Sequence, residues 1–328
     1  MAMDIALTGL ALPLAEFPAL ARESEARGYR TAWVGEASGA EAIVLSTLIA
    51  THTSKIGIAN GVIPVQTRTP IVYGQAAATL AHLAPGRFGL GLGLSSEIIV
   101  GQWHGLPFTP SIQQMREAVQ IIRLAASGER VTFEGKFYRL KNFRLAIPAP
   151  SPPPRIYLAA LGPRMCELAG EIADGVLLNW LPPSAVPVCV RHVETGAKRA
   201  GRSLSEIDVA VYVRTCVTEE AASVREALAR DITGYAIVSV YARFFTECGF
   251  GAEVEAVNSA WKAGDRAGAV KGISERVLDG LGAVGSAAAC REQISAFART
   301  GATPVVVPFA RPGADARASM LGTLRAFP

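Results

Sequence analysis

Short apolar runs alternate with stretches of helical spacing along most of this chain. Residues 4–10 form an apolar run, and in 13–27 the apolar residues recur at helical spacing before Gly28, which stands where a helix C-cap would. The same order of strand and helix continues to about residue 95, which favours right-handed crossovers and a parallel sheet. The pattern predicts strands at 4–10, 31–35, 55–62, 87–94, 155–160, 175–179, 207–217 and 303–308, and helices at 13–27, 40–51, 71–83, 111–126, 164–172, 186–199, 286–299 and 314–325.

Eight strands, each followed by a helix, predict an α/β fold of the (β/α)8 or TIM-barrel type, in one domain of residues 1–328. Two stretches break the alternation and are predicted to be insertions after strands four and seven. The first, about 128–153, contains a predicted β-hairpin at 131–140, whose alternating apolar residues suggest one face packed on the barrel. The second, about 217–280, is predicted to be mostly helical.

Composition narrows the class of protein. Half of the 328 residues are hydrophobic and 18% are charged, which excludes intrinsic disorder. The net charge of +4, with no basic run, argues against a nucleic-acid partner, and no apolar window is long enough to span a membrane. Five widely spaced cysteines without a CxxC pair, and a start that lacks signal-peptide features, lead us to expect a cytoplasmic enzyme without a zinc site.

Candidate chemistry is expected at the carboxyl ends of the strands, where barrel enzymes bind their ligands. His104 follows the fourth strand in the segment Trp103-His104-Gly105-Leu106-Pro107-Phe108, where proton exchange near neutral pH would be useful. No second histidine stands at ligand spacing, so no metal site is predicted. The residues expected to line a substrate pocket are Thr8, Trp103, Phe108 and Trp180.

A row of glycines at a spacing of two, Gly89, Gly91 and Gly93, leaves one face of the fourth strand without side chains. Such a face allows close approach to the backbone, either by a flat cofactor at the mouth or by packing inside the barrel. The row also resembles a dinucleotide-binding GxGxxG motif, but its last position is Ser96, and no acidic residue stands about 20 residues further on at a strand end.

A turn after the fifth strand is the best candidate for an anion site. In Ala160-Leu161-Gly162-Pro163, the proline stands where the first helical turn needs no amide donor. The amides before it, with the helix N-terminus behind them, would point toward a phosphate group. An ordinary strand-to-helix turn would also explain this motif on its own.

Three segments together resemble the luciferase-like flavin oxidoreductases, and among them the branch that uses the deazaflavin coenzyme F-420. They are Gly86-Arg87-Phe88 with the glycines of strand four, P-R-I-Y-L-A-A-L-G-P at 154–163 and A-G-E-I-A-D-G-V-L-L-N at 169–179. The likeness covers nearly the whole chain and is weakest in 217–280. It implies a TIM barrel, a homodimer, and flavin-type redox chemistry on a small organic substrate.

The resemblance also implies positions for the cofactor. A non-prolyl cis peptide at the end of strand three would correspond to the bond between Gly61 and Val62. The cofactor phosphate would lie against the amides of Leu161 and Gly162 and the side chain of Asn179. The full set of cofactor-binding residues that we expect is Gly35, Glu36, Asn60, Gly61, Val62, Gly93, Ser95, Ser96, Ala160, Leu161, Gly162 and Asn179.

One departure from the family pattern bears on the substrate. The sugar-phosphate dehydrogenases of this branch have a catalytic glutamate where this chain has Ser96, and an asparagine where it has Ile99. We therefore expect reduction at a C=C, C=O or C=N bond, with His104, Glu36 or Ser96 handling the proton, in that order. An FMN-dependent monooxygenase and a non-catalytic flavin-binding barrel remain as alternatives.

Overall fold

The structure, a computed structural model, describes residues 2–7, 13–109 and 111–328. Eight parallel strands close into a ring in the order β1, β2, β3, β5, β8, β9, β10 and β12. The ring is closed because β12 pairs with both β10 and β1, while β9 pairs with β10. The predicted (β/α)8 barrel is confirmed.

The strands are β1 (Asp4–Ala6), β2 (Thr31–Val34), β3 (Gly57–Asn60), β4 (Ile63–Pro64), β5 (Phe88–Gly93), β6 (Val131–Glu134), β7 (Arg139–Phe143), β8 (Arg155–Ala159), β9 (Gly175–Asn179), β10 (Asp208–Val217), β11 (Gly282–Gly285) and β12 (Thr303–Pro308). The helices are α1 (Phe17–Ala26), α2 (Ala42–His52), α3 (Pro70–Leu83), α4 (Ile112–Ala126), α5 (Pro163–Ile172), α6 (Val186–Arg199), α7 (Ala221–Ala236), α8 (Ser239–Phe245), α9 (Gly251–Lys262), α10 (Arg266–Lys271), α11 (Glu275–Leu281), α12 (Ala287–Ala298) and α13 (Ala316–Arg325). Two π-helical turns, η2 (Ile98–Trp103) and η5 (Thr246–Phe250), and three short 3-10 turns, η1 (Leu14–Glu16), η3 (Pro183–Ala185) and η4 (Leu204–Glu206), complete the elements.

Strand β11 is absent from the sequence-based prediction. Its residues, Gly282–Gly285, begin and end with glycine, and such a segment is typical of a loop. In the structure it pairs with the last four residues of β10, Arg214–Val217, outside the closed ring. This pairing extends the edge of the barrel toward the helical insertion.

The barrel interior contains a separate apolar cluster. Large side chains of Trp33 and Tyr157, which meet edge to face at 5.1 Å, fill it together with small residues such as Ala59 and Ala210. The side chain of Asp4 lies at the amino-terminal end of the strands, where it accepts hydrogen bonds from Trp33 Nε1 at 2.8 Å and from Arg30. These contacts occupy the amino-terminal end of the barrel, and barrel enzymes bind their ligands at the carboxyl end.

The glycine row of β5 packs against its neighbours inside the barrel. A Cβ atom on Gly89 would lie 2.6 Å from the ring of Tyr157, and one on Gly93 would lie 2.7 Å from Val62 Cγ2. A Cβ on Gly91 would overlap the main-chain carbonyl oxygen of Asn60. Of the two interpretations of this row, close packing is the one that the structure shows.

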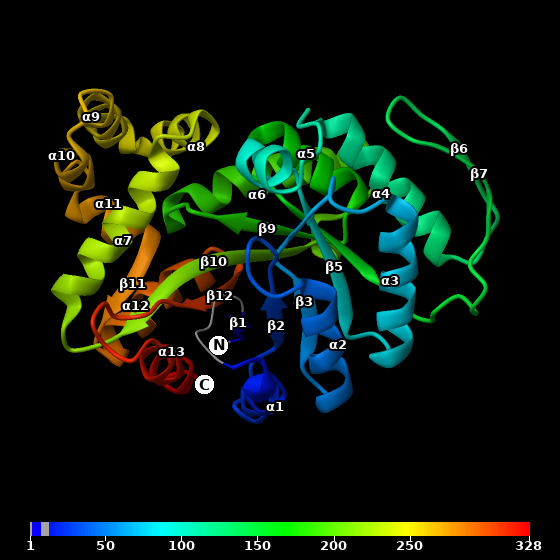
Figure 1. Ribbon diagram of the computed structural model, residues 1–328, viewed down its shortest axis with the longest axis horizontal. Coiled ribbons are helices and arrows are strands. Elements are labelled where there is room, and N and C mark those ends of the chain that lie inside the picture. Colours follow the sequence, from blue (N-terminus) through cyan, green and yellow to red (C-terminus); the bar gives the residue numbers. More distant parts are fainter. Residues whose placement is uncertain (1, 8–12, 110) are drawn as a thin grey trace.

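Two insertions project on opposite sides of the barrel, with helices α7–α11 on one side and the β6–β7 hairpin on the other (Figure 1). The hairpin was expected to pack one face on the barrel. Instead it is tied to α4, because the buried carboxylate of Glu117 accepts hydrogen bonds from the amides of Lys136, Phe137 and Tyr138 at 2.8–3.2 Å. Its partly covered face includes Val131, which is buried.

The two ends of the described chain meet beside the closed end of the barrel (Figure 1). The hydroxyl of Tyr29 donates to the carbonyl oxygen of Leu324 at 2.8 Å, and Arg27 donates to the carbonyl oxygen of Arg325 at 2.7 Å. Helices α1 and α13 are thereby joined. Across the described ranges, none of the helices combines the length and the apolar character needed to cross a membrane.

Replacing Gly91 by alanine should lower the free energy of unfolding by about 1–3 kcal/mol or more, because the new methyl group overlaps a main-chain carbonyl that cannot rotate away. Urea denaturation followed by circular dichroism measures this change. The matched control is Gly322→Ala in α13, where nothing lies within 4 Å of the new atom and a small gain in stability is expected. Equal effects of the two variants would contradict the packing described for β5.

Candidate active site at the barrel mouth

The open end of the barrel is lined by the inward-facing residues at the carboxyl ends of the strands. Because side chains alternate along a strand, the residues beyond the interior cluster face this mouth. Four of the residues predicted to bind the cofactor lie there, and they are Gly35, Val62, Gly93 and Asn179. The predicted pocket residue Thr8 lies outside the described residues.

A bulge between β3 and β4 raises Val62 into the mouth. The peptide bond between Gly61 and Val62 is cis, as the family resemblance implied. Three hydrogen bonds hold the bulge: Gly61 N donates to Val34 O at 2.9 Å, Glu36 N donates to Val62 O at 3.1 Å, and Tyr212 Oη donates to Gly61 O at 2.9 Å. The bulge is therefore fixed from the neighbouring strand and from the opposite wall of the barrel.

Tyr212 was not singled out from the sequence. Its side chain comes from β10 and reaches across the barrel interior, where burial raises the pKa of its hydroxyl above the ordinary value. A neutral hydroxyl is a suitable donor to a carbonyl oxygen at any physiological pH. The available signal was the two-residue period of β10, which puts Tyr212 on the same face as buried Ala210.

Glu36, at the end of β2, forms an ion pair with Arg68. Two guanidinium nitrogens of Arg68 each lie 2.8 Å from a carboxylate oxygen of Glu36, and the amide of Ala42 donates to the same carboxylate at 3.1 Å. Burial raises the pKa of Glu36, but the hydrogen bonds from Arg68 and Ala42 outweigh it and hold the pKa below its usual value. Glu36 is therefore ionised at neutral pH and cannot donate a proton there, which weakens its predicted catalytic role.

The segment after β5 forms the π-helical turn η2. Ser95 has a positive φ of 61° and is exposed, while Ser96 is half-buried and its Oγ accepts a hydrogen bond from the amide of Ile99 at 3.4 Å. His104 ends the turn with an exposed side chain, and Trp103 is 54% exposed. Phe108, further along, is half-buried. The predicted substrate-facing residues of this segment thus lie at the surface beside the mouth.

Two predicted residues have side chains that do not line an open pocket. Asn60 is fully buried, and its Nδ2 donates to Ser46 Oγ of α2 at 3.0 Å, because the alternation of β3 turns this side chain away from the mouth. Trp180 is 1% exposed and its φ is 56°, which turns its ring under the guanidinium of Arg214, 3.9 Å from Cζ to the ring centre. Asn60 and Trp180 therefore support neighbouring residues.

The turn before α5 has the geometry of an anion site. Ala160 is buried and its amide donates to Leu177 O at 3.2 Å, whereas among the described residues the amides of Leu161 and Gly162 have no acceptor. Gly162 is the N-cap of α5, with Pro163 at the first helical position, and nothing lies within 4 Å of where its Cβ would be. Two amides without an acceptor thus stand at a helix N-terminus, where nothing crowds the Cβ position of Gly162.

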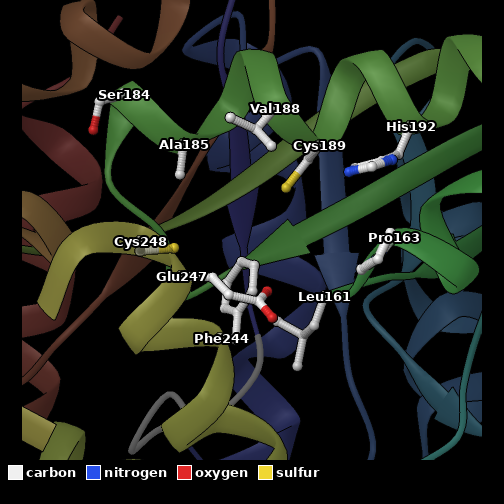
Figure 2. A pocket seen from close by; sticks show the side chains of 10 residues that line it. All are labelled: Leu161, Pro163, Ser184, Ala185, Val188, Cys189, His192, Phe244, Glu247 and Cys248. Carbon is white, nitrogen blue, oxygen red and sulfur yellow. The ribbon is translucent and has the colours of Figure 1, made fainter. Parts of the chain in front are cut away.

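A pocket of about 150 Å³ opens beside this turn (Figure 2). Leu161 and Pro163 form one side of it, and Phe244 and Glu247 from the helical insertion form another. The remaining lining residues are Ser184, Ala185, Val188, Cys189, His192 and Cys248. All five cysteines are free thiols. A search of the described residues finds no cluster of three or more side chains able to hold a metal ion.

The described mouth therefore combines the bulge at Val62 with the main-chain amides of Leu161 and Gly162, which have no acceptor in the described part of the chain. Two further charged residues there, Arg68 and Arg214, are absent from the predicted set of site residues. Arg68 pairs with Glu36, as described above, and also with Glu41. Arg214 shares the inward face of β10 with Tyr212, and its Nη1 donates to Asn179 Oδ1.

Comparison with known proteins agrees with this geometry. The family model described as luciferase-like monooxygenase matches residues 4–304. A 5,10-methylenetetrahydromethanopterin reductase of Methanolobus tindarius is 27% identical over 297 residues, covering 90% of each chain. A Mycobacterium tuberculosis protein, provisionally named a coenzyme F-420-dependent oxidoreductase, is 27% identical over 88% of this chain and 89% of its own. The solved coenzyme F-420-dependent tetrahydromethanopterin reductase of Methanopyrus kandleri superposes with a TM-score of 0.80 at 26% identity, covering 99% of this chain and 97% of that one.

Replacing Glu36 by glutamine should lower the free energy of unfolding by about 1–2 kcal/mol at pH 7, because the amide loses the charge-assisted bonds to Arg68. A carboxylate with a lowered pKa stabilises the folded state above its unfolded pKa of about 4.3, and this contribution is lost as the pH falls through the folded pKa. The difference between the two proteins should therefore shrink below about pH 4.

Urea titrations of both proteins over a pH series measure this difference. The control is Glu134→Gln on the exposed hairpin, where the facing Arg139 nitrogen lies 3.9 Å away and no measurable change is expected. A constant difference across the series would show that Glu36 is not held as a carboxylate by Arg68.

Proposed function

The chain belongs to the luciferase-like monooxygenase family, and on this premise we propose that it is a coenzyme F-420-dependent oxidoreductase. It would transfer a hydride between the deazaflavin and a small organic substrate, at a C=C, C=O or C=N bond. The observation that carries this proposal is the likeness of nearly the whole chain to a solved reductase that uses coenzyme F-420.

The mouth offers a fitting site for such a cofactor. The amides of Leu161 and Gly162 at the start of α5 would hold its phosphate group, together with Asn179. The bulge at Gly61 and Val62 would support the ring system, with Gly35 beside it. When bound, a deazaflavin supplies a carbon centre that gives or takes a hydride and favours two-electron chemistry.

The residues of the chain would then bind and orient. Tyr212 keeps Gly61 in place, so the position of Val62 under a flat ring is set before any ligand arrives. Glu36, held as a carboxylate, orients Arg68 at the edge of the mouth. His104 Nδ1 or Nε2 would hold or release the proton that accompanies hydride transfer, and Ser96 Oγ would donate a hydrogen bond to the substrate or the ring.

The alternative function is an FMN-dependent monooxygenase, which the description of the family model favours. A non-catalytic flavin-binding barrel is the second alternative. The homodimer and the cytoplasmic location that we expected from the sequence stay predictions, and light scattering of the purified protein will check the first of them.

If the proposed function is correct, the purified protein should bind coenzyme F-420 more tightly than FMN. Titrations of both cofactors, followed by their visible absorption, measure the two dissociation constants. Tighter binding of FMN, with oxygen consumption during turnover, would favour the monooxygenase.

The same titration locates the phosphate. Gly162→Leu should weaken cofactor binding about tenfold or more, since its side chain fills the space in front of the amides. Gly322→Leu is the matched control, because Gly322 in α13 also has nothing within 4 Å of its Cβ position and α13 is bound by Tyr29 beside the other end of the barrel. Unchanged affinity of the Gly162 variant would place the phosphate elsewhere.

His104→Ala should slow turnover by about a hundredfold while cofactor affinity stays unchanged, because a lost general acid affects the chemical step alone. Single-turnover kinetics with bound cofactor, across a panel of unsaturated and carbonyl compounds, make the measurement. His52→Ala is the control, since His52 ends α2 with its Nδ1 2.9 Å from Leu48 O. Wild-type rates in the His104 variant would assign this side chain to the surface loop only.

A further inference from the structure

Arg214 holds a charge at the mouth that no residue neutralises. Its side chain is half-buried, and its guanidinium lies over the ring of Trp180, with Cζ 3.9 Å from the ring centre. Its Nη1 donates to Asn179 Oδ1. Within the described ranges no carboxylate lies within ion-pair distance of this guanidinium.

Other half-buried arginines of the described chain are compensated. Arg68, Arg116 and Arg225 each pair with carboxylates. Arg87 has no carboxylate, but its two terminal nitrogens donate to the carbonyl oxygens of Ala50, Thr53 and Ile56 at 2.9–3.2 Å. Burying part of a charge without such partners costs free energy. An anionic ligand bound beside Arg214 would supply the missing counter-ion.

The groups around Arg214 leave its charge in place. Burial raises the pKa of Asp231 in α7 and the charge of Arg214 lowers it, but in the described part of the chain no ion pair joins these two side chains. Tyr212 and Tyr241 are neutral, since burial raises the pKa of both hydroxyls and that of Tyr241 to about 12. Among the described residues, the hydrogen-bond and ring contacts of Arg214 are therefore with uncharged groups, the amide of Asn179 and the rings of Trp180 and Tyr212.

Arg214 lies near the amides that form the proposed phosphate site. Leu161 and Gly162 follow β8, Asn179 ends β9, and β9 pairs with β10, with Asn179 opposite Tyr212. Neighbouring strands are about 4.8 Å apart, so the Gly162 turn and the β10 strand end are separated by about 10 Å across Asn179. On the other side of Gly162, the pocket of Figure 2 presents the carboxylate of Glu247, which would repel an anion.

We propose that Arg214, stacked on Trp180 and bonded to Asn179, is the cation of a phosphate-binding site whose other half is formed by the amides of Leu161 and Gly162. The proposal rests on the proposed function, because it adds a charged residue to the same site. The phosphate group belongs either to the cofactor or to a phosphorylated substrate. Arg214 binds it through guanidinium donors that remain after the bond to Asn179.

The experiment compares phosphorylated and dephosphorylated cofactor. Wild type, Arg214→Met and Arg214→Lys are titrated with coenzyme F-420 and with its riboflavin-like form, which lacks the phosphate and the chain attached to it. Arg214→Met should weaken binding of coenzyme F-420 about tenfold or more and leave the dephosphorylated form unaffected. Arg214→Lys keeps the positive charge but loses the planar guanidinium, so its affinity for coenzyme F-420 should lie between those of the wild type and Arg214→Met.

A second variant removes the free charge without removing the arginine. Asn179→Asp puts a carboxylate at the atom that Arg214 already bonds, so it should abolish the preference for the phosphorylated form. The preference of the wild type should also decline with added salt. The matched control is Arg266→Met, since Arg266 stacks on Trp261 at 3.6 Å outside the mouth, and its loss should change neither affinity.

A second arm identifies the source of the phosphate. Inorganic phosphate is titrated by calorimetry into protein saturated with coenzyme F-420. Binding that depends on Arg214 in this arm assigns the site to a substrate phosphate, whereas a loss confined to the cofactor titration assigns it to the cofactor. Equal weakening of both cofactor forms, or no dependence on Arg214 in either arm, overturns the proposal.

Failure of the proposed function gives a different result. Wild type would then bind neither deazaflavin form, whatever residue stands at position 214. The same comparison with FMN and riboflavin, which differ by the phosphate group alone, then tests Arg214 on its own. Circular dichroism melting of each variant confirms that a loss of affinity is not a loss of fold.

Discussion

The hydrogen bond from Tyr212 to the carbonyl oxygen of Gly61 is the interaction on which the geometry of the mouth depends. It joins opposite walls of the barrel and fixes the bulge that carries Val62. The bond needs an uncrowded interior, because a Cβ on Gly61 would overlap the Tyr212 hydroxyl and one on Gly93 would meet Val62. Gly61 of the bulge and Gly93 of β5 therefore serve the site by leaving room for these protein atoms.

Electrostatics divides the mouth into two unlike halves. Beside β2, Arg68 pairs with the carboxylates of both Glu36 and Glu41, so this guanidinium is fully compensated. Beside β10, Arg214 has an aromatic ring and an amide oxygen as partners, and among the described residues no carboxylate pairs with it. A phosphate group is bound best by a cation together with main-chain donors. Of the two halves, the one beside β10 offers a cation of this kind.

Much of the fold could be predicted, because the spacing of hydrophobic residues and the positions of turn residues indicate where strands and helices begin and end. Strand β9, strand β12 and helix α6 have the predicted bounds. Strand β11 was missed because its stability comes from pairing with β10, a contact between segments far apart in sequence. The same limit applies to the site. Candidate positions followed from strand ends, but the ion pair of Glu36 and the inward turn of Trp180 depend on side chains from other elements.

The hydrogen bonds that join α1 to α13 lie apart from the mouth of the barrel, so the contacts that hold the chain ends and the residues of the candidate site are in different places. Tyr29 and Arg27 bind the last helix at the face opposite to the mouth, beside the closed end where Asp4 meets Arg30. Loops on the reactive face can consequently change length and chemistry while the anchoring contacts stay as they are. One barrel can therefore come to bind many different substrates, because the contacts that join its first and last helices lie away from the loops that change.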